Sequence, residues 1–244
     1  MNDHLKKLLI NCDMGEWDAP HLEKMDHKIM PLIDLSNVAC GGHAGSKNII
    51  EETLRCAKDH GIKVGAHPGY PDRINFGRSY ISFDQYLLSD TLKNQLDLFF
   101  SSCVKIGIDP FHIKAHGALY HACNHRKPEA ELMIQLIADL YPDIMLLVTP
   151  GSLLASLAKN HHIKTMSESF IDRQYTEELS LVPRNEQNAV ITDVKQAQKQ
   201  FNLLSIGKIT TRKGTVKNLI SKTACIHGDN PNCLSILNAI HRHG

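Results

Sequence analysis

The chain has 244 residues, of which 42% are hydrophobic and 22% are charged, and its formal net charge at pH 7 is +1. This is the composition of an ordinary globular protein, and the near-neutral charge argues against binding to nucleic acid or to an acidic membrane surface. The seven cysteines form no Cys-x-x-Cys pair and no apolar segment is long enough to span a bilayer, so we expect a cytoplasmic protein that does not enter a membrane.

Short apolar runs alternate with amphipathic segments along the sequence. The runs that predict strands are Leu8–Met14, Leu35–Cys40, Lys63–Pro68, Phe111–His116, Ile144–Thr149, Lys164–Phe170 and Thr223–His227. The segments that predict helices are His21–Ile33, Asn48–Asp59, Ser82–Ile106, Glu129–Leu140, Ser152–Asn160, Asp193–Leu204 and Pro231–His243. We expect Ser82 to cap its helix, Pro231 to lie in the first turn of the last helix, and Lys208–Asn218 to form a hairpin.

This alternation predicts an α/β fold with a parallel sheet and crossover helices, in one domain over residues 1–244. Both an open doubly wound sheet and a closed barrel fit the pattern. An open sheet gathers its site at one switch point, whereas a barrel uses the loops after all its strands. Because polar residues end nearly every strand, we predict an irregular (β/α) barrel of about seven strands.

The period of two in a strand assigns these polar residues to one face. Asn11 and Asp13 share a face of the first strand, and His112, Lys114 and His116 share a face of the fourth. The apolar faces of barrel strands meet the helices, so the polar faces are expected to line the lumen.

The same argument points Asn37, His67 and Glu168 into the lumen. Each of them alone is as well explained as a buried polar group that forms a hydrogen bond with a buried neighbour. A lumen lined by so many polar groups is costly for stability, and the set together therefore indicates function.

The loops after the strands place histidine beside glycine, which lets backbone approach a ligand closely; His43, His67, His116 and His227 all stand in such loops. Asp13, His43, His67 and His116 are candidate ligands of a divalent metal. The turn at Gly228 and Asp229 is suited to an anion at a helix start, although a simple helix cap explains it equally well. His121 and His125 are four residues apart and could chelate a metal if they lie in a helix, but their polar surroundings favour a position on the surface.

Several segments, taken together and in order, resemble the LamB/YcsF family. They are 11–16, 39–45, 65–72, 76–78, 114–120, 168–175, 181–184 and 227–229, and they extend over nearly the whole chain. Members of this family are described as the A subunit of a bacterial ATP-dependent 5-oxoprolinase. The resemblance implies a barrel related to those of glycoside hydrolases and deacetylases. It implies ATP-driven cleavage of 5-oxo-L-proline to L-glutamate, with ATP and Mg as co-substrate and with partner subunits B and C; whether the chain also forms a homo-oligomer stays open.

The resemblance also suggests roles for individual residues. Lys114 with Arg173 or Arg184 would neutralise phosphate charge, and Asp13 or Glu168 would activate water or orient a histidine. His43, His67 and His116 are candidates for proton transfer. The residues expected to bind substrate or phosphate are Asn11, Asn37, Arg78, Asp172, Arg173, Arg184, His227 and Asp229.

The sequence departs from the family pattern at Leu9, Gly42, Ser46, Ala115 and His121. At Leu9 the family often has Asp, so a carboxylate is missing from the inward face of the first strand. Two other functions stay open: a metal-dependent amidohydrolase or deacetylase that needs no nucleotide, and a scaffold subunit without chemistry of its own.

Overall fold

Seven parallel strands close into a barrel. The computed structural model describes residues 7–17 and 20–242, with only the backbone at 20–24. The barrel strands follow one another as β1 (Leu9–Met14), β2 (Leu35–Ala39), β3 (Lys63–His67), β4 (Pro110–Ile113), β5 (Met145–Val148), β6 (Thr165–Phe170) and β9 (Thr223–Ile226). Strand β9 pairs with both β6 and β1 and completes the ring. The predicted barrel of about seven strands is confirmed.

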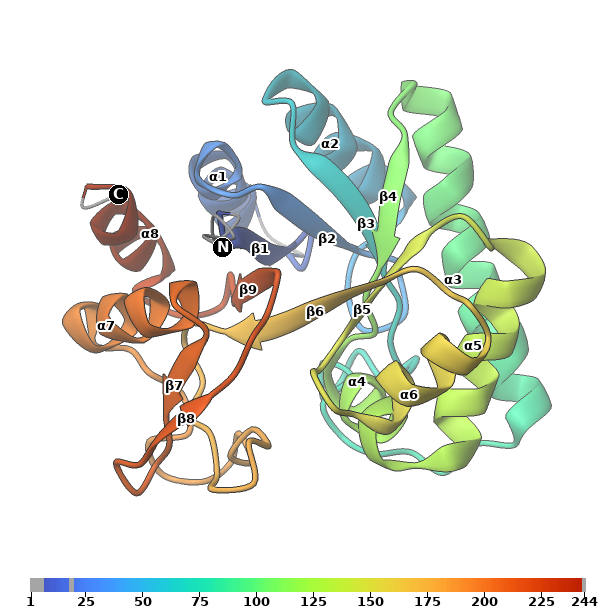
Figure 1. Ribbon diagram of the computed structural model, residues 1–244. Coiled ribbons are helices and arrows are strands. Elements are labelled where there is room, and N and C mark those ends of the chain that lie inside the picture. Colours follow the sequence, from blue (N-terminus) through green and yellow to red (C-terminus); the bar gives the residue numbers. More distant parts are fainter. Residues whose placement is uncertain (1–6, 18–19, 243–244) are drawn as a thin grey trace, which may run out of the picture.

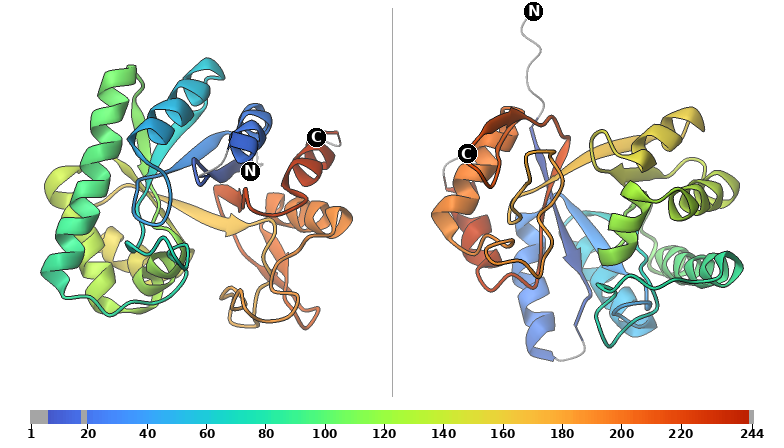
Figure 2. Two further views of the ribbon diagram at one scale, coloured as in Figure 1. Left: turned by 180° about the vertical axis from the view of Figure 1, so that it is seen from behind. Right: turned by 90° about the horizontal axis from the view of Figure 1, so that it is seen from below.

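Helices surround the barrel on its outside (Figures 1 and 2). They are α1 (Pro20–Ile29), the short η1 (Met30–Leu32), α2 (Lys47–Asp59), α3 (Gln85–Ile106), α4 (Gly117–His125), α5 (Lys127–Leu140), α6 (Leu153–Asn160), α7 (Val194–Ser205) and α8 (Cys233–His241). Between α7 and β9, strands β7 (Lys208–Thr210) and β8 (Val216–Asn218) form the predicted antiparallel hairpin. In the described part of the chain, no helix is long and apolar enough to cross a membrane.

Two predicted helix starts are wrong. Helix α3 begins at Gln85, and its N-cap is Asp84, whose carboxylate accepts from Tyr86 N and Leu87 N, rather than Ser82. Helix α8 begins at Cys233, so Pro231 precedes the helix instead of lying in its first turn. The predicted end of this last helix at His243 lies outside the described residues.

Helix α4 is absent from the sequence expectation. Its buried residues are Leu119, Tyr120, Ala122, Cys123 and Asn124. His121 interrupts this set and the polar Asn124 belongs to it, which conceals the apolar face. The β4 ladder ends at Ile113, but the chain continues in the same direction: Lys114 N donates to Ala66 O and His116 N donates to Pro68 O. The side chains of Lys114 and His116 are therefore carried beyond the end of the strand.

The register explains which residues line the lumen. At the amino ends of the strands, a small apolar cluster closes the barrel; it consists of Leu35, Leu147 and Met166, with Leu9, Phe111 and Met145 packed against them. Above this cluster the inward positions become polar. In particular, Asp13 pairs with Asn37 across β1 and β2, and Gly65 pairs with His112 across β3 and β4. The polar residues thus gather at the carboxyl end of the barrel, where barrel enzymes carry their sites.

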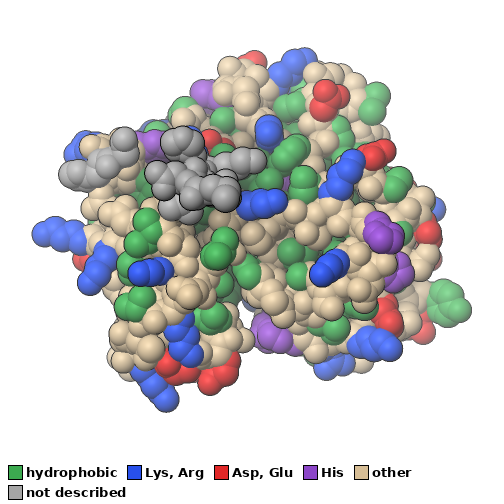
Figure 3. Space-filling view, in the orientation of Figure 1, with side chains coloured by type: hydrophobic (Ala, Val, Ile, Leu, Met, Phe, Trp, Pro, Cys, Tyr) green, Lys and Arg blue, Asp and Glu red, His purple; other side chains and the backbone are tan. Residues whose placement is uncertain are grey.

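The outer surface has no simple charge pattern on the face drawn in Figure 3, where Lys and Arg are interspersed with Asp, Glu and hydrophobic side chains.

Candidate active site

Lys114 lies inside the barrel and contacts two carboxylates. Its Nζ donates to Asp13 Oδ1 at 3.0 Å and forms an ion pair with Glu168 Oε1 at 3.0 Å. It also donates to Asn11 Oδ1 at 3.3 Å and to Cys225 Sγ at 3.0 Å, and all of these side chains are buried. Burial would lower the pKa of Lys114, but Asp13 and Cys225 outweigh it and hold the pKa well above its usual value. The ammonium therefore stays charged at neutral pH.

A layer of amides fixes Asp13 from below. Asn37 Nδ2 donates to Asp13 Oδ1 at 2.7 Å and to Asn11 Oδ1 at 2.8 Å, and His112 Nε2 donates to Asn37 Oδ1 at 2.6 Å. Burial raises the pKa of Asp13, but His67 and Lys114 outweigh it and hold the pKa well below its usual value. Asp13 is therefore an oriented, ionised carboxylate.

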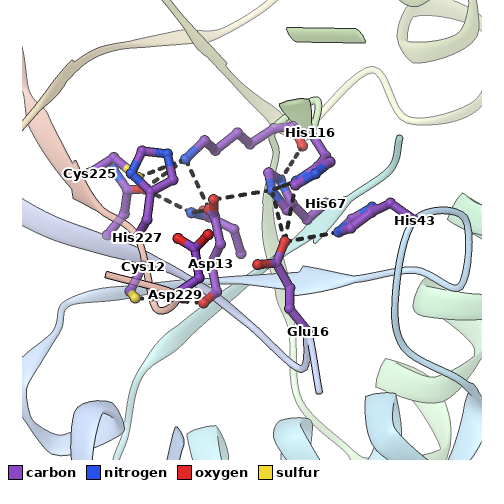
Figure 4. Close-up of polar contacts among 12 residues, drawn as sticks. Cys12, Asp13, Glu16, His43, His67, His116, Cys225, His227 and Asp229 are labelled. Atoms are coloured by element: carbon purple, nitrogen blue, oxygen red, sulfur yellow. Dashed lines mark hydrogen bonds and ion pairs between the residues drawn. The ribbon is translucent and has the colours of Figure 1, made fainter. Parts of the chain in front are cut away.

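Beside Asp13, three histidines converge on Glu16 (Figure 4). Glu16 Oε1 lies 2.9 Å from His43 Nε2, 3.2 Å from His116 Nδ1 and 3.9 Å from His67 Nε2. The rings of His43 and His116 stack with centroids 3.5 Å apart. Gly77, with a φ of +61°, lets the backbone pass over this stack, since a Cβ there would lie 2.8 Å from that of His43.

The hydrogen bonds of His67 and His116 determine which ring nitrogens carry protons. His67 Nδ1 lies 2.8 Å from Lys114 O, and His116 Nε2 lies 2.9 Å from Phe76 O. A carbonyl oxygen only accepts, so these two nitrogens donate. In the neutral rings the other two nitrogens then bear lone pairs, yet His67 Nε2 and His116 Nδ1 face each other at 3.0 Å. This meeting of acceptors, next to Glu16 Oε1, requires a proton or a cation between them.

The cluster fits a metal ion. Glu16, His43, His67 and His116 each offer one ligand atom, and these atoms all lie within 4.8 Å of one another. Three imidazole nitrogens and one carboxylate oxygen are ligands that zinc accepts, and metal-bound histidines usually donate their other nitrogen to a carbonyl or carboxylate, as His67 and His116 do. Asp13 lies next to this group; its Oδ2 is 3.4 Å from His67 Nε2. Without a metal, burial lowers the pKa of His43 to about 3, helped by His116.

A second group of ligand atoms, from Asp13, Cys225 and His227, is less suited to a metal. Lys114 Nζ already lies 3.0 Å from both Asp13 and Cys225, and its positive charge opposes a cation there. His227 is instead oriented by Asp172. Its Nδ1 donates to Asp172 Oδ1 at 2.8 Å, so in the neutral ring Nε2 is the acceptor and can take a proton.

Three arginines surround this end of the barrel. Arg78 and Arg184 both donate to Asp229, at 2.5 and 2.7 Å. Arg173 is buried, and its Nη2 donates to Val182 O at 2.6 Å.

The structure brings together all six residues predicted to be catalytic: Asp13, His43, His67, Lys114, His116 and Glu168. Asn11 and Asn37 hold Asp13, while Arg78, Asp172, Arg173, Arg184, His227 and Asp229 lie around them at the mouth. His121 and His125 are exposed on α4, as expected. Sequence reasoning did not select Glu16, although it stands in a matched segment. The feature that could have pointed to Glu16 is its place directly after Gly15, which has a φ of +69° and follows the last residue of β1.

The departure at Gly42 has a local explanation. A Cβ at Gly42 would lie 2.4 Å from the amide oxygen of Gln95, which reaches over from α3. That amide bonds to both the N–H and the carbonyl of Gly69, at 3.0 and 2.8 Å. Gln95 therefore fills the space that a larger residue at position 42 would need.

Fold and site together define a parallel (β/α)-barrel protein with a buried, charged centre at the carboxyl end of its strands, which is the arrangement of a barrel enzyme. The chain belongs to the LamB/YcsF family, whose sequence profile matches residues 8–243.

Named relatives extend this likeness over nearly the whole chain. The A subunit of 5-oxoprolinase from Staphylococcus aureus strain MRSA252 is 37% identical over 232 residues, which are 95% of this chain and 93% of the relative. The crystal structure of the lactam utilization protein from Thermus thermophilus matches with a TM-score of 0.88 and 30% identity, over 97% of this chain and 95% of that one. A putative cellobiose-phosphate cleavage protein from Enterococcus faecalis V583, with a TM-score of 0.59 and 12% identity over 97% of this chain and 93% of its own, shares the fold.

Proposed function

We propose that this chain is the A subunit of an ATP-dependent 5-oxoprolinase, which hydrolyses 5-oxo-L-proline to L-glutamate in the cytoplasm together with subunits B and C. The names of the relatives, a lactam utilization protein and a 5-oxoprolinase component, support a role in lactam hydrolysis. The observation that carries the proposal is the buried Lys114, held between Asp13 and Glu168 and adjoining the His67–His116 pair.

The chemistry explains why ATP is needed. A five-membered lactam is a poor electrophile. Transfer of the terminal phosphoryl group of ATP to the lactam oxygen gives ADP and an activated imidate. Water then adds to the ring carbon, and the C–N bond of the adduct breaks to give the free amine and an acyl phosphate. A second water hydrolyses this acyl phosphate, which leaves the glutamate carboxylate and releases phosphate with the former lactam oxygen. The phosphoryl oxygens and the developing charge need fixed cations, and the addition of water needs a base.

The residues of this site suit those tasks. Lys114 supplies a buried positive charge that needs no reorganisation during the reaction. His227, oriented by Asp172, and the His67–His116 pair are the candidate proton acceptors. Asp13 orients His67 and Lys114 at once. Arg78, Arg173 and Arg184 are the candidate partners of anionic substrate groups.

The test is release of glutamate from 5-oxoproline with ATP and Mg, measured with and without subunits B and C. Wild type should release glutamate in the complete mixture, and Asp13→Asn, which keeps the size of the side chain, should lose at least about a hundredfold in rate. Wild-type turnover by Asp13→Asn would remove Asp13 from the mechanism. A scaffold subunit would tolerate this substitution.

A second candidate function, a metal-dependent amide hydrolase without nucleotide, is favoured by the unneutralised acceptors of Glu16, His67 and His116. A bound divalent ion such as zinc or manganese would supply a Lewis acid and lower the pKa of bound water to about 7. Metal analysis of the purified chain tests this: about one equivalent that is lost in Glu16→Gln supports it. Absence of metal from wild type, with turnover that resists chelators, argues against it.

A further inference from the structure

Arg173 is a buried cation for which the described part of the chain supplies no counter-ion. Arg173 is only 8% exposed, and its Nε has no hydrogen-bond partner among the described residues. Among the described residues it forms one hydrogen bond, from Nη2 to Val182 O, and no ion pair. Burying a charge without an opposite charge costs several kcal/mol, so an uncompensated guanidinium indicates a missing anion.

The adjacent carboxylate, Asp172, forms no ion pair with Arg173 because other donors already engage it. Asp172 Oδ1 accepts from His227 Nδ1 at 2.8 Å, and Oδ2 accepts from His227 N at 3.2 Å and from Asn230 Nδ2 at 3.1 Å. Both oxygens of Asp172 are thus engaged by His227 and Asn230. The positive charge of Arg173 is left for something else.

The charges of two further guanidinium groups act on Arg173, whose Nη2 is bonded to Val182 O, two residues before Arg184. Burial lowers the pKa of Arg173, and the charges of Arg184 and Arg78 lower it further, against the opposing effect of Asp172. Arg184 Nη2 donates to both oxygens of Asp229 at 2.7 Å, and Arg78 Nη2 donates to Oδ2 at 2.5 Å. Among the described residues, Asp229 is therefore the carboxylate that Arg78 and Arg184 share.

Asp229 is held in a way that permits exchange. Its side chain is 34% exposed, and those of Arg78 and Arg184 are 35% and 26% exposed. It lies two residues after His227, whose ring approaches Asp13 within 4.8 Å, and Figure 4 shows Asp229 on the same side of the site as His227. An anion at this position would adjoin the catalytic centre.

We propose that Arg78, Arg173 and Arg184 form a site for one oxyanion, a carboxylate or a phosphoryl group, and that Asp229 occupies two of the three arginines until that ligand displaces it. Asp229 thus acts as an internal competitor, which keeps the surface arginines paired in the free protein. The choice of ligand rests on the proposed function, because 5-oxoproline carries a carboxylate beside its lactam and ATP carries phosphates. The site itself does not depend on it.

The experiment is calorimetric titration of the full chain with inorganic phosphate. Asp229→Asn keeps the shape of the side chain but removes the competing charge, so it should bind phosphate severalfold more tightly than wild type. Arg184→Gln should bind about tenfold more weakly, because it loses a charge-assisted contact. Arg212→Gln, which breaks an exposed ion pair with Glu186, is the matched control and should bind as wild type does. If Arg184→Gln fails to fold, Arg78→Gln replaces it.

A second titration separates the two sources of the anion. Pyrrolidin-2-one is the same lactam without a carboxylate. If 5-oxoproline binds more tightly than pyrrolidin-2-one, and Arg184→Gln removes the difference, the site takes the substrate carboxylate. If the two lactams bind alike while phosphate binds, the site takes a phosphoryl group.

Two results would overturn the proposal. Unchanged or weaker phosphate binding by Asp229→Asn would show that Asp229 does not compete. Failure of both wild type and Asp229→Asn to bind phosphate or 5-oxoproline would remove the site altogether. Because these are binding measurements, they stand apart from glutamate release: a chain that binds the anion but shows no turnover would sink the proposed function and leave this site in place.

Discussion

Lys114 is the residue on which the charges inside the barrel depend. Asp13 and Glu168 are 5% and 1% exposed, and its ammonium lies 3.0 Å from an oxygen of each. Carboxylates at such depth stay ionised at low cost only beside a fixed cation. The same ammonium that serves the proposed chemistry therefore also offsets negative charge in the lumen.

Lys114→Met tests this dual role. The substitution leaves two buried carboxylates without their cation, so we expect the free energy of unfolding to fall by about 3–5 kcal/mol, measured by urea denaturation. Lys105→Met is the matched control, since Lys105 pairs with Glu51 but is itself 57% exposed, and should cost about 1 kcal/mol or less. Equal losses in the two variants would show that Lys114 does not stabilise the lumen.

The period of two in β-strands was sufficient to place Asn11, Asp13, His112 and Lys114 inside the barrel. Each of them lies in a strand or directly after one, where alternation still holds. Glu16 lies two residues beyond β1, after a left-handed glycine, where alternation gives no direction. The distances that define the histidine cluster join four separate segments, the end of β3 and three loops, and no local pattern encodes them.

At the scale of elements, β3 and β4 meet through a glycine. A Cβ at Gly65 would lie 2.3 Å from the ring of His112, and the register between the two strands shifts at this point. Gly65 thus makes room for the ring that bonds to Asn37. The close packing of these two strands therefore also sets the position of the polar layer.

Gly65→Ala should therefore destabilise the protein by about 1–3 kcal/mol through overpacking. In the double variant with His112→Ala the clash disappears. The loss of unfolding free energy in the double variant should therefore be smaller than the sum of the two single losses by more than about 0.5 kcal/mol, measured in a double-mutant cycle. Strict additivity would mean that the glycine is needed for its backbone and not for the space it leaves.

The start of α3 gives a second test at this scale. Asp84→Ala removes the carboxylate that accepts from Tyr86 N and Leu87 N, and should cost about 0.5–2 kcal/mol of unfolding free energy. Ser82→Ala, at the position that the sequence favoured, should change it by about 0.5 kcal/mol or less. A larger loss of unfolding free energy in Ser82→Ala than in Asp84→Ala would place the helix start two residues earlier.

Both Ser82 and Asp84 are good caps, and only the backbone path chooses between them. Helices with an uninterrupted apolar face, such as α2 and α5, were predictable to within two residues. Helix α4 was not, because its buried positions depend on contacts with other elements: Tyr120 Oη and Asn124 Nδ2 both bond to Thr149 Oγ1 beyond β5.

Closure of the barrel is a property of the whole molecule. Polar residues at nearly every strand end predicted a barrel, and the ring β1 to β6 with β9 confirms it. The last pairing joins Glu168 of β6 to Thr223 of β9 across the intervening helix and hairpin. Nothing in the local sequence specifies that partner; it follows because an unpaired edge inside a ring of helices would leave buried backbone groups unsatisfied.

Global stability should therefore respond to the state of the buried lumen, and His112 gives the clearest case. Burial, helped by Lys114, lowers its pKa to about 3, whereas the unfolded chain has a value of about 6.5. Between these values the unfolded state binds a proton that the folded state does not. Stability is unaffected by this group above pH 6.5 and falls as the pH drops toward 3, by up to about 1.4 kcal/mol per pH unit.

Urea denaturation of wild type and His112→Gln between pH 7.5 and 4 measures this term. Gln can still donate to Asn37 Oδ1 but does not titrate, so the difference in unfolding free energy between the two proteins should shrink as the pH falls, with a slope approaching one proton per molecule. Taking the difference cancels the carboxylates that titrate in the same range. His161→Gln, at an exposed position on the surface, should follow the wild-type curve. Parallel curves for wild type and His112→Gln would mean that folding does not lower the pKa of His112.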